Sequence, residues 1–205
     1  MNLNLAEQHV RRAGAGAILL ALASIFPGIG RGLRRPAAGT AGRFTVWLRR
    51  PLFLLLTGTG YFALCWRLWR PLPVAISRPL RAAALIAGSL LYFPGLALVL
   101  WSRLTLAEMY YVSGSFGAQL FTGHRLITGG PFAYVRHPMY LGILLVALGG
   151  LLLYRTWTFV FLLANVPALV IRACREEAAL AEAFGEQWAT YCEQVPPWLP
   201  QIRVS

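Results

Sequence analysis

The sequence predicts an all-α integral membrane protein, and three observations indicate this class. Hydrophobic residues make up 58% of the 205 residues, and the mean hydropathy of +0.59 is far above that of ordinary soluble domains. Five apolar runs follow one another along the chain, and most of the 19 arginines lie between them. We expect a single membrane domain over residues 1–205, with about five transmembrane helices and a C-terminal amphipathic helix.

Two apolar runs in the first half have the length of membrane helices. A helix needs about 20 residues to cross a bilayer, with about 17 as a practical minimum. The run 82–102 is the cleanest span, and its Pro94 predicts a kink. The run 51–69 begins at Pro51, a residue favoured in the first turn of a helix. Residues 1–104 are therefore expected to form the N-terminal membrane helices.

The first apolar run, 14–29, leaves three possibilities open: a span, an interfacial helix or a signal peptide. Arg11 and Arg12, followed by an apolar core, fit a signal peptide. However, no convincing cleavage site precedes the arginine-rich stretch 31–50. We favour a membrane segment that is retained.

The runs 139–154 and 156–173 follow each other so closely that they predict a tight helical hairpin within 138–174. Pro167 should kink its second helix. Both runs are short, so the polar residues beside them should lie close to the membrane surface. The hairpin belongs to a second half, 105–205, which contains the stretches that indicate chemistry.

The formal charge of +12 comes from arginine and glutamate alone, because the chain has no Lys and no Asp. Basic residues are enriched in cytoplasmic loops, so we place 31–50, 103–138 and the C-terminal tail in the cytoplasm. Nucleic-acid binding is not expected, because arginines between apolar runs are typical of loops that face anionic lipids. No metal site is predicted either, since Cys65, Cys174 and Cys192 are widely spaced and fit free thiols.

The stretch GGPFAYVRHPMYLG, residues 129–142, leads into the hairpin. Pro138 disfavours helix at His137 and suits the first position of a new helix, where backbone N–H groups are free to bind an anion. Arg136 adds a guanidinium group suited to carboxylate or phosphate. Tyr134 and Tyr140 bracket these residues with aromatic rings. The alternative is a membrane-edge anchor made of a snorkelling arginine, a capping histidine and interfacial tyrosines.

The stretch NVPALVIRACREEAAL is the second group of polar residues in an apolar context. Asn165, Arg172 and Glu176 share one helix face, and Arg172 and Glu176 can pair. Glu177 points about 100° away, so the two glutamates cannot both face one ligand on a regular helix. Charges at a membrane edge are expensive and indicate a functional site; the alternative is a juxtamembrane helix end with ordinary ion pairs.

An apolar stripe follows the two glutamates. Leu180, Phe184, Trp188 and Tyr191 recur at intervals of four, four and three, which predicts an amphipathic helix on the membrane or over a pocket. The pair at 196–197, both prolines, is expected to end this helix.

The second half of the chain, over about residues 115–200, resembles the isoprenylcysteine carboxyl methyltransferase family and its phospholipid methyltransferase relatives. The resemblance rests on the order of four features: RHPMYLG, the hairpin, EEAALAEAFG and a Trp/Tyr-rich tail. The resemblance implies a membrane enzyme with its active site and cofactor-binding loops at the cytoplasmic face. It implies S-adenosylmethionine as methyl donor, S-adenosylhomocysteine as product, and a lipophilic acceptor that enters from the bilayer among the membrane lipids. Trp188 and Pro197 differ from the residues common at these places in the family. These differences bear more on the expected binding of the acceptor than on that of the cofactor.

Site residues follow from the resemblance and from side-chain chemistry. Aromatic rings can stack on adenine or face a sulfonium, and an arginine can hold a carboxylate acceptor. The expected catalytic residues are Arg172, Glu176 and Glu177. The expected cofactor-binding residues are Tyr134, Arg136, His137, Pro138, Tyr140, Gly142, Glu176, Glu177 and Trp188.

Two alternatives to a methyltransferase stay open. One is a membrane reductase of the sterol-reductase type that uses NADPH, because such enzymes share an Arg-His-Pro-like motif. The other is a non-enzymatic membrane scaffold. The sequence does not choose the acceptor among an isoprenylcysteine-like or other lipophilic carboxylate, a thiol and an amine, and it does not indicate an oligomeric state. A thiol acceptor would need a base, for which His137, Glu176 and Glu177 are candidates.

Overall fold

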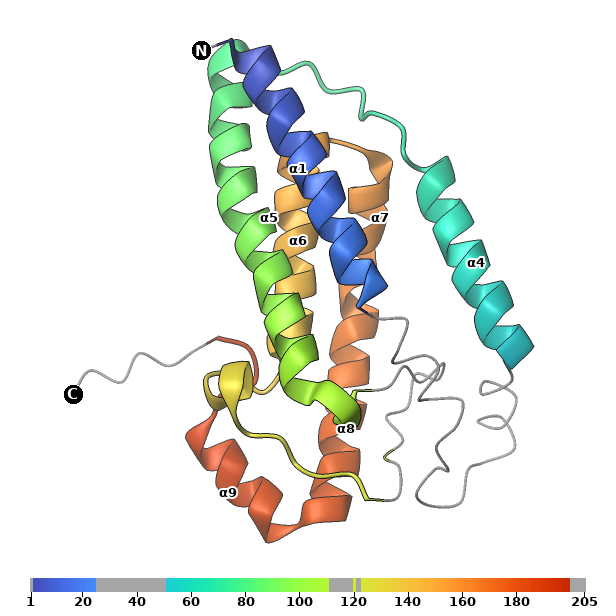
Figure 1. Cartoon of the computed structure of the whole chain (residues 1–205), viewed down its shortest axis with the longest axis vertical. Coiled ribbons are helices and arrows are strands. Elements are labelled where there is room, and N and C mark those ends of the chain that lie inside the picture. The colour runs from blue at the N-terminus through green and yellow to red at the C-terminus, as the bar shows by residue number, and fades with distance from the viewer. Residues whose placement is uncertain (1, 25–50, 111–119, 121–122, 200–205) are drawn as a thin grey trace, which may run out of the picture.

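The computed structural model describes residues 2–24, 51–110, 120 and 123–199 of the chain (Figure 1). Within these ranges the regular elements are helices, apart from one isolated antiparallel bridge between Pro71 and Thr156. The all-α prediction is thus confirmed for the described residues. In chain order the elements are α1 (Leu3–Ala23), α4 (Pro51–Arg67), α5 (Arg78–Leu106), the 3-10 helices η1 (Ala107–Met109) and η2 (Gly130–Ala133), α6 (Pro138–Tyr154), α7 (Trp157–Ala164), α8 (Val166–Phe184) and α9 (Glu186–Gln194).

The centre of the molecule is a helical bundle in which α5 and α6 pack side by side in opposite directions (Figure 1). Glycines on both helices allow this close approach. A Cβ atom on Gly142 would lie 2.8 Å from the backbone oxygen of Gly95, and one on Gly149 would lie 2.5 Å from the backbone nitrogen of Tyr92. Small residues at such contacts are how membrane helices bring their backbones together. Gly142 therefore serves helix packing.

The first helix lies along α5 and runs parallel to it. Glu7 near the start of α1 contacts Arg81 near the start of α5, while the Arg103 Nε near the end of α5 donates to the Ser24 carbonyl oxygen at 3.0 Å. The predicted apolar run 14–29 thus forms the later part of α1 as far as the described residues extend, and the helix begins earlier, at Leu3. Residues 25–29 lie outside the described residues.

The predicted hairpin is present, and its second half is interrupted. α6 ends at Tyr154, and the chain reverses at Arg155, which has a φ of +53°. The kink predicted at Pro167 occurs as a break at Asn165, which separates α7 from α8. Proline lacks an N–H group and crowds the preceding turn, so the break falls just before it. By contrast, α5 continues as a helix through Pro94.

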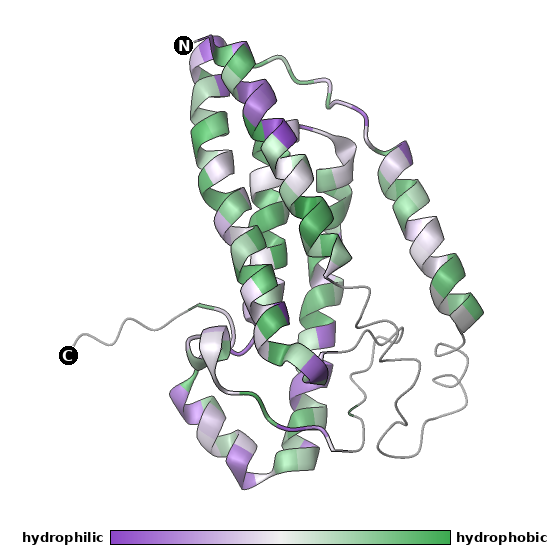
Figure 2. Ribbon diagram, in the orientation of Figure 1, coloured by the Kyte–Doolittle hydropathy of each residue, from purple (hydrophilic) through white to green (hydrophobic). Residues whose placement is uncertain are grey.

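Two helical segments, Arg78–Met109 and Trp157–Phe184, are long and apolar enough to cross a membrane by length and composition, and α6 is a shorter apolar helix. Figure 2 shows hydrophobic residues along much of the bundle, with hydrophilic residues concentrated toward its ends and in α9. Large apolar side chains such as Leu90 and Leu104 are exposed on α5, as is Trp66 on α4. Exposed apolar surface of this extent is suited to lipid contact. The other predicted spans stay predictions.

The predicted C-terminal amphipathic segment is divided. Gly185, with a φ of +51°, ends α8 and precedes α9. Trp188, Tyr191 and Val195 are buried together, and Leu180 and Phe184 pack against them across the break. The apolar stripe read from the sequence is therefore the inner face of a corner, which folds α9 back beneath the bundle (Figure 1).

Candidate active site

A cavity of about 370 Å³ lies where the end of α5, the start of α6, α8 and α9 meet. Its volume is in the range of small-molecule sites. The polar and aromatic lining comprises Tyr110, His124, Arg125, Phe132, Arg136, His137, Tyr140, Arg172, Glu176, Trp188 and Tyr191. The apolar lining includes Leu106, Met109, Met139, Ile143, Leu169 and Leu180. One cavity thus combines charged groups with an apolar wall.

The Arg-His pair is held by the C-terminal tail. The backbone N–H groups of Arg136 and His137 donate to the carbonyl oxygens of Pro196 and Pro197 at 2.9 and 3.1 Å. The expectation of free backbone N–H groups at this helix start is therefore wrong at His137, because the proline segment occupies them. The two prolines predicted only to end a helix instead anchor the motif.

Glu177 connects the two side chains of this pair. Its Oε1 lies 2.9 Å from His137 Nε2 and 3.4 Å from Arg136 Nε. A carboxylate only accepts, so the histidine Nε2 is the donor of this hydrogen bond. His137 is buried, and its ring lies between Tyr140, at 5.7 Å, and Trp198, at 5.2 Å between centroids. The imidazole is thus fixed by one carboxylate and two aromatic neighbours.

Glu176 forms a separate group on the cavity wall. The Tyr140 hydroxyl donates to Glu176 Oε1 at 2.6 Å, and Arg172 Nε donates to the same oxygen at 3.1 Å and to the Tyr140 hydroxyl at 2.9 Å. The two adjacent glutamates therefore bind different partners, as their angular separation on the helix requires. Arg172 and Glu176 neutralise each other at the lining of the cavity.

Aromatic side chains from α9 complete the wall opposite α8. Trp188 and Tyr191 are buried, and the guanidinium carbon of Arg136 lies 5.8 Å from the centre of the Trp188 ring. Arg136 also donates from Nη1 to the Cys192 sulfur at 2.5 Å. The Tyr191 hydroxyl donates to the Phe132 carbonyl oxygen at 2.6 Å, and burial raises the pKa of Tyr191 to about 12. The phenol consequently stays neutral and holds η2 against α9.

The structure brings most of the predicted site residues together. Arg136, His137, Pro138, Tyr140, Arg172, Glu176 and Trp188 line the cavity, and Glu177 binds two of them from behind. Tyr134 is not among the lining residues: its side chain is 62% exposed and its ring lies 6.5 Å from Trp101. Gly142 is buried in the α5–α6 contact and does not line the cavity.

Sequence reasoning missed four contributors to the site. All of them come from the segment after the amphipathic stripe and contact the Arg-His pair: Cys192, Trp198 and the carbonyl groups of Pro196 and Pro197. The density of aromatic and proline residues in that segment was the available signal. In the part of the chain that the structure describes, no group of three or more His, Cys, Asp or Glu residues could hold a metal ion.

Comparison with known proteins places this geometry in a family context. A protein-S-isoprenylcysteine O-methyltransferase of Schizosaccharomyces pombe is 38% identical over 81 residues, which cover 38% of this chain and 34% of the relative. A methanethiol S-methyltransferase of Bradyrhizobium diazoefficiens is 26% identical over 183 residues, covering 78% of this chain and 60% of the relative. A Delta(14)-sterol reductase of Mus musculus is 36% identical over 78 residues, covering 37% of this chain and 19% of the relative.

The chain thus covers less than two thirds of the length of each of these relatives. A family model described as phospholipid methyltransferase matches residues 83–187, just over half of the chain. The matched range includes most of α5, the Arg-His-Pro motif, the hairpin and both glutamates. The chain belongs to the phospholipid methyltransferase family.

Proposed function

We propose that this protein is a membrane methyltransferase that uses S-adenosylmethionine and methylates a lipophilic acceptor, with the cavity at the start of α6 as its active site. The observation that carries the proposal is the mixed lining of the cavity. Arg136, His137, Tyr140, Arg172 and Glu176 line the same cavity as apolar side chains such as Ile143 and Leu169, so polar and apolar groups share its lining. Two substrates of different polarity require such a site.

The side chains present fit the chemical groups of the cofactor. Arg136 Nε is buried and makes no hydrogen bond of good geometry within the described residues, although Glu177 lies 3.4 Å away. A guanidinium suits the cofactor carboxylate. A glutamate suits ribose hydroxyls, and Trp188 offers an aromatic face to adenine or the sulfonium. Bound there, the cofactor would supply an electrophilic methyl group on a positively charged sulfur.

The acceptor is expected on the apolar wall. Ile143 lies one turn beyond Tyr140 on α6, and Leu169 lies one turn before Arg172 on α8; both line the cavity. Both positions are displaced from the polar group toward the middle of the bundle. A lipophilic molecule arriving from the bilayer would therefore present its polar end to Arg172 and Glu176.

Methyl transfer is an in-line displacement in which an acceptor lone pair forms a bond to the methyl carbon while the carbon–sulfur bond breaks. The protein aligns the reactants and excludes water. A carboxylate acceptor releases no proton and would contact Arg172. A thiol releases a proton, for which Glu176 is the carboxylate on the cavity wall. The names of the two relatives above, an isoprenylcysteine and a methanethiol methyltransferase, support both classes.

The direct test is methyl transfer from radiolabelled S-adenosylmethionine by the full chain in liposomes, against panels of lipophilic carboxylates, thiols and amines. We expect incorporation with at least one panel. Glu176→Gln and Glu177→Gln should each lower S-adenosylhomocysteine binding or turnover, whereas Glu182→Gln on the exposed face of α8 should not. If both site variants bound and turned over as the wild type does, the role of the glutamate pair would be refuted.

A reductase is the second candidate, because a sterol reductase is 36% identical over 78 residues of this chain. A cofactor titration separates the two functions. Binding of S-adenosylhomocysteine supports the methyltransferase, and binding of NADPH supports the reductase. Binding of neither would favour a protein without enzymatic activity.

A further inference from the structure

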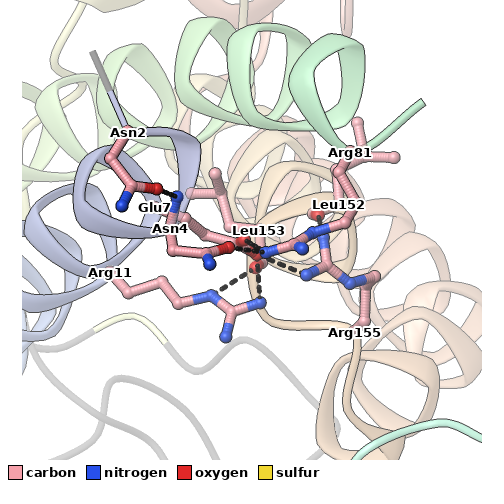
Figure 3. A network of polar contacts seen from close by, with 8 residues as sticks. All are labelled: Asn2, Asn4, Glu7, Arg11, Arg81, Leu152, Leu153 and Arg155. Carbon is pink, nitrogen blue, oxygen red and sulfur yellow. Dashed lines mark hydrogen bonds and ion pairs between the residues drawn. The ribbon is translucent and has the colours of Figure 1, made fainter. Parts of the chain in front are cut away.

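Four charged side chains gather at the end of the bundle opposite the candidate active site. Glu7 from α1 is 5% exposed, and its carboxylate contacts Arg11, Arg81 and Arg155 (Figure 3). Arg11 Nη2 donates to Glu7 Oε1 at 2.6 Å, and Arg155 Nη2 donates to the same oxygen. Arg81 Nη2 donates to Oε2. We call these four residues the Glu7 cluster.

The Glu7 cluster carries an excess of positive charge that the described residues do not balance. Three guanidinium groups surround one carboxylate, which leaves a formal charge of +2. The carboxylate is covered, but the side chains of Arg11, Arg81 and Arg155 keep 35%, 33% and 22% of their surface exposed. The cluster therefore presents a cationic rim to its surroundings and hides its only anion.

Hydrogen-bond donors also remain at this rim. Arg11 Nε donates to the Leu153 carbonyl oxygen, Arg155 Nη1 to that of Leu152, and Arg81 Nη2 to Asn4 Oδ1. When the bonds to Glu7 are included, each guanidinium uses two of its five N–H donors on partners within the described residues (Figure 3). A tetrahedral anion with several acceptor oxygens matches three such converging groups.

The position of the Glu7 cluster along the bundle indicates which anion it would meet. α6 has 17 residues, so it is about 26 Å long. This is close to the thickness of the hydrocarbon core of a bilayer, which is about 30 Å. His137 precedes the helix and Arg155 follows it. With α6 across the bilayer, as the sequence predicts, the two polar sites would lie near opposite membrane surfaces. Exposed Leu5 and Leu80 flank the cluster with apolar surface.

We propose that the Glu7 cluster is a binding site for the phosphate group of an anionic phospholipid, in the leaflet opposite the candidate active site. Arg11, Arg81 and Arg155 bind the phosphate, and Glu7 holds the three guanidinium groups in position. Because the first helix contributes Glu7 and Arg11, a bound lipid would also link α1 to the ends of α5 and α6. This inference does not depend on the methyl-transfer proposal.

The test measures thermal unfolding of the full chain in detergent while phosphatidylglycerol or phosphatidylcholine with the same acyl chains is added. We expect phosphatidylglycerol to raise Tm more strongly. Arg81→Gln and Arg155→Gln should each increase the concentration needed for half of the effect about fivefold, because one arginine near a membrane surface contributes about that factor to binding of anionic lipid. Arg12→Gln changes the exposed neighbour of Arg11 on α1; it is the control and should leave this concentration unchanged.

Glu7→Gln separates a lipid site from a purely structural ion-pair cluster. Removal of the carboxylate lowers Tm in phosphatidylcholine in either case, since the arginines lose their partner. At a lipid site phosphatidylglycerol should restore part of the lost Tm, because its phosphate replaces the carboxylate as partner of the arginines, whereas at a purely structural cluster the two lipids should give the same Tm. Equal responses to both lipids, or wild-type responses in Arg81→Gln and Arg155→Gln, would overturn the proposal. A full effect of inorganic phosphate alone would overturn the assignment to a lipid.

Discussion

Glu177→Gln tests whether the carboxylate behind the Arg-His pair prepares the cavity for its ligand. The variant keeps the shape of the side chain and an acceptor oxygen for His137 Nε2, 2.9 Å away, but it removes the charge that faces Arg136 Nε at 3.4 Å. A hydrogen bond involving a charged group contributes about 1.5–3 kcal/mol, against about 0.5–1.5 kcal/mol for a neutral one. The Glu177 side chain is 28% exposed, so solvent screening brings the expected loss to about 1 kcal/mol.

A loss of this size weakens binding about fivefold. Isothermal titration with S-adenosylhomocysteine should show this for Glu177→Gln, and a larger loss for Glu177→Ala, which also leaves His137 Nε2 without its acceptor. Glu182→Gln on the same helix controls for a general effect of lost charge. Wild-type affinity in Glu177→Gln would refute the electrostatic reasoning, and equal losses in the glutamine and alanine variants would refute the contribution of the hydrogen bond to His137.

Three further predictions concern the scaffold of the site. Gly149→Ala should lower the free energy of unfolding by about 1–3 kcal/mol, because the added Cβ would meet backbone atoms of α5. Gly16→Ala should not lower it, since nothing lies within 4 Å of a Cβ at that position. Thermal unfolding in detergent compares the two variants. Trp198→Ala should weaken S-adenosylhomocysteine binding several-fold by freeing the His137 ring, and Trp198→Phe should restore part of the affinity measured by titration. The raised pKa of Tyr191 favours the neutral phenol in the folded state. The contribution of this phenol to stability is therefore complete below about pH 10 and is lost as the pH rises toward 12. Tyr191→Phe should remove this part of the pH dependence of Tm.

Local rules account for what was predicted well. Pro138 begins α6, and the helix break comes just before Pro167. Glu176 and Glu177 bind different partners because adjacent helical residues point about 100° apart. These features depend on a few neighbouring residues, and backbone sterics act at that range.

Contacts between distant segments account for what was missed. The Pro196 carbonyl meets the Arg136 amide across 60 positions of sequence, and no periodicity connects them. Tyr134 is close to the motif in sequence and Trp198 is far from it, yet of these two it is Trp198 that contacts His137. The choice depends on how the tail crosses the start of α6.

By itself, the sequence determined the helical class, the hairpin, the family motif and the separate directions of the two glutamates, because hydropathy, proline stereochemistry and helical periodicity act locally. Only the tertiary structure decided that Gly142 serves packing, that the proline segment occupies the motif's backbone donors, and that Glu7 gathers three arginines from three separate segments of the chain. These outcomes depend on which helix faces meet when apolar surface and buried charges must be satisfied together, and residues far apart in the chain share that requirement.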